Sequence, residues 1–208
     1  MTLVKICGIT NLDDAVAAVE AGADALGFNF FQQSPRYIPP LQARNVIENL
    51  PPQVLKVGIF VNEQSPEIVR KIAVQSGVRA VQLHGSEGPD YCAELADYYV
   101  IKAFAVDNSF SPAVIKSYAV DAMMLDSRDD RLHGGTGRII DWGVARDIRD
   151  TGATVFLAGG LSPENVSEAI AVVRPYAVDS CSLLESEPGK KNPDRMRAFV
   201  KAVRGVKP

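Results

Sequence analysis

The sequence is poor in cysteine and histidine, the residues that build disulfide frameworks and zinc sites. Its 208 residues include only three cysteines and two histidines. Cys7, Cys92 and Cys181 are odd in number and widely separated, and no two of them form a CxxC pair. Neither His84 nor His133 belongs to an HExxH motif. This pattern argues against a disulfide scaffold and a zinc hydrolase, suits a reducing compartment, and predicts chemistry without a metal.

Long apolar runs and flexible linkers are also missing. No apolar stretch reaches the roughly 18 residues that a membrane helix needs, and the start MTLVKICGIT lacks the apolar segment of a secretory signal. No Pro-, Gly- or Ser-rich linker divides the chain, and 47% hydrophobic residues suffice for one large core. We therefore expect a single catalytic domain over 1–208, cytoplasmic and without a membrane partner.

An excess of positive charge is absent as well. The chain has 22 Lys and Arg residues against 25 Asp and Glu residues, and the cations are spread along its length. This balance argues against nucleic acid as a partner. A small anionic ligand stays compatible with it, because backbone amides and a few local cations can hold a phosphate. The sequence leaves monomer and homodimer both open.

What the chain does have is a regular alternation of apolar, β-prone runs and helical segments. Helix signals include Gly22 at a C-cap position, and Asn192-Pro193-Asp194, which has an N-cap residue, a proline at the first helical position and an acid. The same order of an N-cap residue, a proline and an acid occurs in Ser65-Pro66-Glu67 and in Ser162-Pro163-Glu164. Strands are expected at 3–7, 25–30, 54–61, 80–84, 99–106, 122–126, 155–159 and 177–182.

Eight such strands predict an α/β fold, a single-domain (β/α)8 TIM barrel. The alternative is an open doubly wound sheet, which commonly carries a glycine-rich fingerprint after its first strand. Only Gly8 follows the first run here. In the barrel, the loops after the strands build the site.

Cys7 and Asp126 each close an apolar run, where a reactive group would stand at the mouth of the barrel. Lys5 and Cys7 share the side of their strand that we expect to face the interior. The thiol could act as nucleophile or base if a cation lowered its pKa from about 8.5, and the alternative is a small buried cysteine. Asp126 could transfer a proton if its pKa were raised, or it could cap the next turn together with Ser127.

Two glycine-rich segments and two polar side chains complete the candidates. Gly135, in HGGTGR, fits neither the Walker nor the dinucleotide spacing and is interpreted as part of a flexible cover. Gly159 and Gly160 separate a strand from a helix N-terminus, which favours anion binding or a plain tight turn. Arg36 could clamp a carboxylate or be solvated. His84 could bind a ligand at the rim or be structural, and Cys92 is interpreted as packing.

Taken together, the motifs strongly resemble those of phosphoribosylanthranilate isomerases of tryptophan biosynthesis, in order and over almost the whole chain. They are KICGIT, GFNFFQQSPRYI, VGIFVN, VQLHG, LDS followed by GGTGR, FLAGGLSPENV and PGKK. The resemblance implies a single-domain barrel that converts N-(5'-phosphoribosyl)anthranilate to 1-(2-carboxyphenylamino)-1-deoxyribulose 5-phosphate, an Amadori rearrangement without metal or organic cofactor. By the same resemblance, Cys7 is the general base at C2', Asp126 the general acid at the ring oxygen, and Arg36 the holder of the anthranilate carboxylate.

One segment departs from the family pattern. The strand-eight loop usually reads D-V-S-S-G-V-E, whereas this chain has Leu183 where glycine is expected, directly after Ser182. In the family this loop and the Gly159-Gly160 turn form the phosphate cradle, so a side chain there would alter the approach of the backbone. We expect intact chemistry with a reshaped phosphate site that still takes up millimolar phosphate or sulfate.

Two other hypotheses were weighed. Another phosphosugar barrel enzyme, such as a metal-dependent epimerase, would need a histidine-rich metal cluster that two histidines cannot supply. A binding module that has lost its activity would need neither Cys7 nor Asp126.

Overall fold

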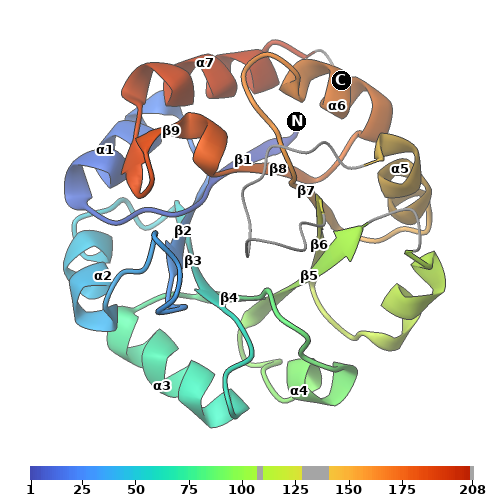
Figure 1. The fold of residues 1–208 in the computed structure, drawn as a ribbon, viewed down its shortest axis with the longest axis horizontal. Coiled ribbons are helices and arrows are strands. Elements are labelled where there is room, and N and C mark those ends of the chain that lie inside the picture. The colour runs from blue at the N-terminus through green and yellow to red at the C-terminus, as the bar shows by residue number, and fades with distance from the viewer. Residues whose placement is uncertain (107–109, 128–140, 207–208) are drawn as a thin grey trace.

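Eight parallel strands pair in chain order, and the eighth returns to the first to close a barrel. The computed structural model describes residues 1–106, 110–127 and 141–206. The predicted (β/α)8 barrel is confirmed, and Figure 1 shows the strands as a central ring inside a ring of helices. The strands are β1 (Leu3–Ile6), β2 (Ala25–Asn29), β3 (Leu55–Phe60), β4 (Ala80–Leu83), β5 (Tyr99–Val106), β6 (Ala122–Ser127), β7 (Val155–Leu157) and β8 (Ala177–Ser180).

The helices begin and end largely where the local signals indicate. Gly22 ends the first helix with φ 100°, and Pro193 opens the last one behind Asn192, whose side chain accepts hydrogen bonds from two backbone N–H groups. A short 3₁₀ helix takes the helical place between β5 and β6. The helical elements are α1 (Leu12–Ala21), α2 (Pro40–Ile47), α3 (Pro66–Ser76), α4 (Pro89–Ala93), η1 (Pro112–Ser117), α5 (Trp142–Asp150), α6 (Val166–Val173), η2 (Ser182–Leu184) and α7 (Pro193–Arg204).

Three predicted boundaries near the mouth of the barrel were wrong by two residues or more, whereas the other predicted strand ends differ by at most one residue. β7 stops at Leu157, two residues early, because the chain turns to a φ of 82° at Gly159. β8 stops at Ser180, because Cys181 bends away with φ −129° and ψ −86°. Helix α6 begins at Val166 rather than behind Ser162, which opens a separate turn. These shifts leave longer loops where the site lies.

The alternation of side chains along the strands separates two packing regions. Val4 and Ile6 of β1 are fully buried against the helices, as expected. The residues inside the barrel form a second cluster of mostly small side chains, Ala25, Val57, Ala80, Ile101, Ala103, Ala122, Met124, Phe156, Ala158 and Ala177. Lys5 faces this interior and is also fully buried. A buried ammonium requires a partner of opposite charge, and for Lys5 this partner is Asp179.

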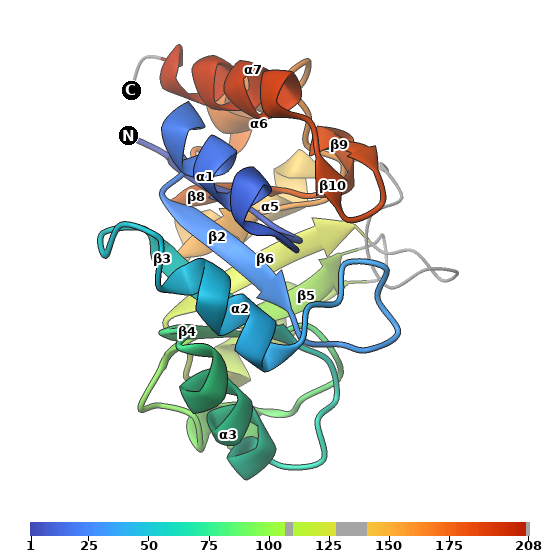
Figure 2. The ribbon, with the colours of Figure 1, turned by 90° about the vertical axis from the view of Figure 1, so that its left-hand side faces the viewer.

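The two ends of the barrel differ. A hairpin of β9 (Glu185–Glu187) and β10 (Lys190–Lys191) lies at the end where the strands terminate, and the start of β1 and the end of α7 lie at the other (Figure 2). Among the described helices, none has the length and apolar character that crossing a bilayer would require.

Candidate active site

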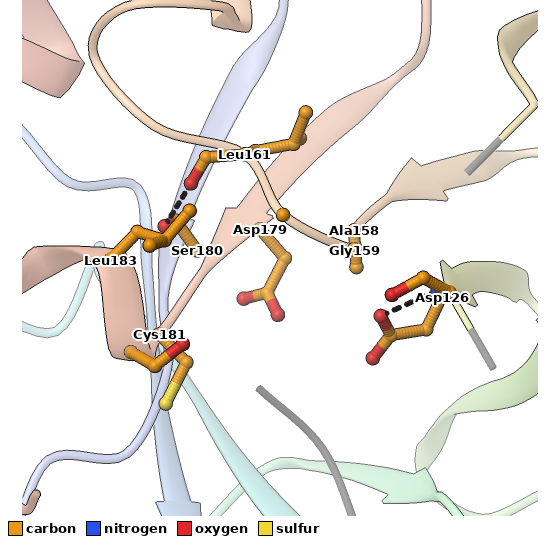
Figure 3. Close-up of a pocket in the computed structure, with 11 residues that line it drawn as sticks. Asp126, Ala158, Gly159, Leu161, Asp179, Ser180, Cys181 and Leu183 are labelled. Atoms are coloured by element: carbon orange, nitrogen blue, oxygen red, sulfur yellow. Dashed lines mark hydrogen bonds between the residues drawn. The ribbon is translucent and has the colours of Figure 1, made fainter. Parts of the chain in front are cut away.

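Two adjoining cavities open at the C-terminal ends of the strands. The larger, of about 130 Å³, is lined by residues that include Cys7, Arg36, His84 and Asp126. The smaller, of about 50 Å³, lies between the loops that follow β7 and β8. Three side chains, Asp126, Asp179 and Cys181, border both. Figure 3 shows Asp179 between Cys181 and Asp126, with its carboxylate directed into the pocket.

Cys7 directly follows β1, and the polar face of that strand is held by an ion pair. Lys5 Nζ donates to Asp179 Oδ1 across the β1–β8 junction at 2.8 Å. Burial lowers the pKa of Lys5, but Asp179 and the thiol of Cys7 outweigh it, so the pKa is raised and the ammonium persists. The cation that could activate Cys7 is therefore shared with a carboxylate.

The second thiol of the site, Cys181, contacts Cys7 directly. A hydrogen bond between the two side chains, together with burial, raises the pKa of Cys7 well above its ordinary value. The same hydrogen bond lowers the pKa of Cys181, and the ammonium of Lys191, 3.7 Å from Cys181 Sγ, acts in the same direction. These shifts favour the protonated form of Cys7 and the thiolate form of Cys181. Cys181 Sγ also donates a hydrogen bond to Glu185 Oε1 at 3.8 Å, which favours the protonated form of Cys181.

Asp126 ends β6 with its carboxylate divided between two partners. Oδ1 accepts a hydrogen bond from the backbone N–H of Ser127 at 2.8 Å, which is the turn-capping role predicted as the alternative. Oδ2 lies 3.5 Å from His84 Nε2. Both side chains are partly open to the cavity, with 20% and 30% of their surfaces exposed. Both carboxylate oxygens therefore have partners, while the side chain still borders the larger cavity.

His84 is oriented by Gln82, two residues earlier on β4. Gln82 Nε2 lies 2.7 Å from His84 Nδ1, so the amide donates to Nδ1 and the ring proton sits on Nε2, toward Asp126. Burial lowers the pKa of His84, but the hydrogen bond and charge of Asp126 outweigh it, and the pKa is raised. Gln82 is 1% exposed, and its Oε1 has no partner among the described residues.

Arg36 is held in place by a buried carboxylate. Its Nε and Nη2 donate to Glu185 at 2.8–3.3 Å, and Lys191 Nζ donates to the same carboxylate at 2.8 Å. Burial would raise the pKa of Glu185, but the two cations hold it below its ordinary value. Because Nε and Nη2 donate to Glu185, the N–H groups on the opposite edge of the Arg36 guanidinium can donate to a ligand carboxylate.

The smaller cavity has the features of an anion cradle. Gly159 and Gly160 adopt φ values of 82° and 69°, and a Cβ at Gly159 would lie 2.6 Å from Ser127 N. Only glycine therefore fits there, and its backbone borders the cavity without a covering side chain. The opposite wall is Ser182 and Leu183. Leu183 is not among the described residues with positive φ, so the backbone that carries it is one that leucine accepts.

Several of these residues were not singled out from the sequence. Asp179, Cys181 and Gln82 lie inside predicted strands, and Glu185 and Lys191 lie in the hairpin after β8. The one available signal was Lys5, since an interior lysine needs a carboxylate. Gly135 lies in 128–140, outside the described residues. Cys92 is buried in α4, as predicted, and no cluster of metal ligands occurs among the described residues.

A larger hollow lies elsewhere, at the N-terminal end of the barrel. It measures about 800 Å³ and is bordered by Met1, Arg149, Tyr176 and Val206, among others. Among the described residues that line it there is no pair of carboxyl, thiol or imidazole groups, and barrel enzymes carry their chemistry at the opposite end. We therefore place the active site at the two smaller cavities.

Together the fold and the site define a (β/α)8-barrel enzyme in which titratable side chains line a cavity that adjoins a glycine-lined one. Residues 4–202 match the family model described as N-(5'phosphoribosyl)anthranilate (PRA) isomerase, and the chain belongs to that family.

Individual relatives cover almost the whole chain. The N-(5'-phosphoribosyl)anthranilate isomerase of Trichlorobacter lovleyi is 48% identical over 201 residues, which are 97% of this chain and 97% of its own. The phosphoribosyl anthranilate isomerase of Thermus thermophilus is similar in structure, with a TM-score of 0.91 and 37% identity over 99% of this chain and 100% of its own. A solved isomerase in complex with reduced 1-(o-carboxyphenylamino)-1-deoxyribulose 5-phosphate gives 0.85 and 42% over 99% and 100%.

Proposed function

We propose that Cys7 and Asp126 are the base and the acid with which this chain isomerises N-(5'-phosphoribosyl)anthranilate in tryptophan biosynthesis. The observation that carries the proposal is that both side chains line one cavity, which adjoins the anion cradle and includes Arg36. A phosphate in the cradle and a carboxylate on Arg36 would place the ribose between them.

The reaction adds a proton to the ring oxygen of the sugar and removes a proton from C2'. Asp126 protonates the ring oxygen as the aminofuranose opens, and Cys7 removes the proton from C2' to form the enolamine. Cys7 must first release its own proton, and Cys181, which borders the same cavity, would receive it as the thiolate that the lowered pKa of Cys181 favours. Gly159, Gly160 and Ser182 would hold the phosphate.

Replacing either proton-transferring residue should abolish most of the turnover without unfolding the barrel. We expect Cys7→Ala and Asp126→Asn each to lower kcat/KM by about 10²–10⁴, the usual worth of one placed proton transfer. The measurement is conversion of phosphoribosylanthranilate generated in situ, with circular dichroism to verify folding. Cys92→Ser is the matched control. Full turnover in either variant, or none in the wild type, would contradict the proposal.

The proposal also covers the oligomeric state and the cellular location of the chain. A relative from Thermotoga maritima is described as a dimeric phosphoribosylanthranilate isomerase from which monomers were generated. We infer that this chain works as a monomer or a homodimer in the cytoplasm on a small phosphosugar, without nucleic acid or membrane. The side chains assigned here all come from one chain.

A further inference from the structure

The closure of the barrel brings two cysteines to the adjoining ends of β1 and β8. These strands pair in parallel with Lys5 opposite Asp179, and both of those side chains face the interior, where they are joined at 2.8 Å. Cys7 directly follows β1 and Cys181 directly follows β8, and the pairing extends to this point because Cys7 N donates to Ser180 O at 3.0 Å. Neighbouring strands lie ~4.8 Å apart, within the ~4.4–6.8 Å that a disulfide spans between Cα atoms.

The two cysteines border the same open cavity. Each thiol shifts the pKa of the other, because the two side chains lie close together at the ends of β1 and β8. Both are partly exposed, unlike the fully buried Cys92. A small neutral oxidant that enters the substrate space therefore meets two thiols at once.

Lys191 provides the charge that makes one of these thiols reactive. Its ammonium is fully buried beside Cys181 and stabilises a thiolate there. Because the hydrogen bond from Cys7 also lowers the pKa of Cys181, the first thiolate to form lies on Cys181. Glu185 opposes this effect, because Cys181 Sγ donates a hydrogen bond to its Oε1 at 3.8 Å. The same carboxylate is also paired with Arg36 and Lys191, which reduces its effect on Cys181.

We propose that Cys7 and Cys181 form a redox-active dithiol that hydrogen peroxide closes to a disulfide. The Cys181 thiolate attacks one peroxide oxygen; an S–O bond forms, the O–O bond breaks, and the hydroxide that leaves takes up a proton to become water. Cys7 then attacks the sulfenic sulfur; the S–S bond forms, the S–O bond breaks, and the second hydroxide leaves as water with the Cys7 proton. One peroxide is reduced to two waters, and two thiols become one disulfide.

The consequence for activity rests on the proposed function. A disulfide removes the sulfur that would accept the C2' proton, so the isomerase would stop until a thiol reductant reopened the bond. The bond itself can be detected whether or not Cys7 is the base.

The experiment treats the whole protein with hydrogen peroxide, blocks the remaining thiols with iodoacetamide, and digests with trypsin without reductant. Cleavage after Lys and Arg places Cys7, Cys92 and Cys181 in three different peptides, so mass spectrometry identifies any cross-link by its partners. Parallel samples of Cys181→Ser and Cys92→Ser are treated alike, and activity is followed before and after dithiothreitol.

We expect the Cys7–Cys181 peptide pair in the wild type and in Cys92→Ser, with activity lost and restored by dithiothreitol. In Cys181→Ser, which lacks the thiolate that attacks peroxide, we expect no cross-link, and Cys7 should stay reduced at the peroxide dose that closes the wild-type pair. Oxidation of wild-type Cys7 to sulfinic acid without the pair, or a cross-link through Cys92, overturns the proposal. If the pair forms in a protein without isomerase activity, the dithiol stands and the proposed function fails.

Discussion

At the scale of single residues, the site depends on a buried carboxylate between two cations. Glu185 has 4% of its side chain exposed, Arg36 15% and Lys191 none. Burial of such charges is unfavourable unless each is paired, and removal of one partner leaves the others unpaired. Glu185 therefore fixes the direction of Arg36 before any ligand arrives, which reduces the ordering that binding would require.

Glu185→Gln should weaken substrate binding more than it slows the chemical step. We expect KM to rise by about tenfold, the equivalent of ~1.4 kcal/mol, with a smaller change in kcat, because Arg36 loses its anchor while Cys7 and Asp126 stay in place. The measurement is the separation of KM from kcat in steady-state kinetics. A fall in kcat at unchanged KM would contradict this role.

The lowered pKa of Glu185 also determines the direction in which the free energy of unfolding changes with pH. Because the pKa of folded Glu185 is lowered, its stabilising contribution is present above its unfolded pKa of about 4.3 and is lost as pH falls through the folded value. The free energy of unfolding of Glu185→Gln should therefore change less over this acid range than that of the wild type, as denaturant titrations would measure.

At the scale of elements, the alternation of strands and helices was predictable from the sequence. The residues that the fold brings together from distant parts of the sequence were not. Each strand is marked locally by apolar, β-prone residues, and helix starts such as Pro66 and Pro193 by proline behind a capping residue. Cys7 and Asp126 could be proposed because they end two of these runs. Cys7 and Cys181 come from opposite ends of the sequence and line one cavity because β1 pairs with β8, and no local pattern encodes that pairing.

The turn after β7 should tolerate no side chain. At Gly159 a Cβ would meet Ser127 N at 2.6 Å with φ at 82°, whereas at Gly152, with φ 91°, it would meet nothing within 4 Å. We expect Gly152→Ala to lower the free energy of unfolding by about 1–2 kcal/mol through the backbone alone. Gly159→Ala should lower it further.

Gly159→Ala should also weaken binding of inorganic phosphate, whereas Gly152→Ala should not. Isothermal calorimetry with phosphate and denaturant unfolding on both variants make the comparison. Equal effects of the two substitutions on phosphate would count against a cradle at this turn.

At the scale of the whole molecule, the closure of the barrel includes a buried ion pair. Lys5 on the first strand and Asp179 on the last are 174 residues apart, and their side chains are 0% and 9% exposed. Asp179→Asn should lower the free energy of unfolding by about 3–5 kcal/mol, since it leaves a buried ammonium without its carboxylate.

The matched control for closure is an ion pair on the surface. Glu48→Gln breaks the Arg44–Glu48 pair, whose side chains are 48% and 59% exposed, and should change stability by at most ~0.5 kcal/mol. Denaturant unfolding of both variants tests the difference, and equal losses would show that the buried pair contributes nothing special to closure.

The position of the chain ends has a practical consequence. Met1 and Val206, the first and last described residues, both border the hollow at the N-terminal end of the barrel. The cavities that we assign to the substrate lie at the other end, as does the β9–β10 hairpin (Figure 2). A resin, a sensor surface or a second enzyme could be attached through either end and leave the mouth facing the bulk solution. Immobilised in this way, the catalyst would be reached by substrate without obstruction from its own tether.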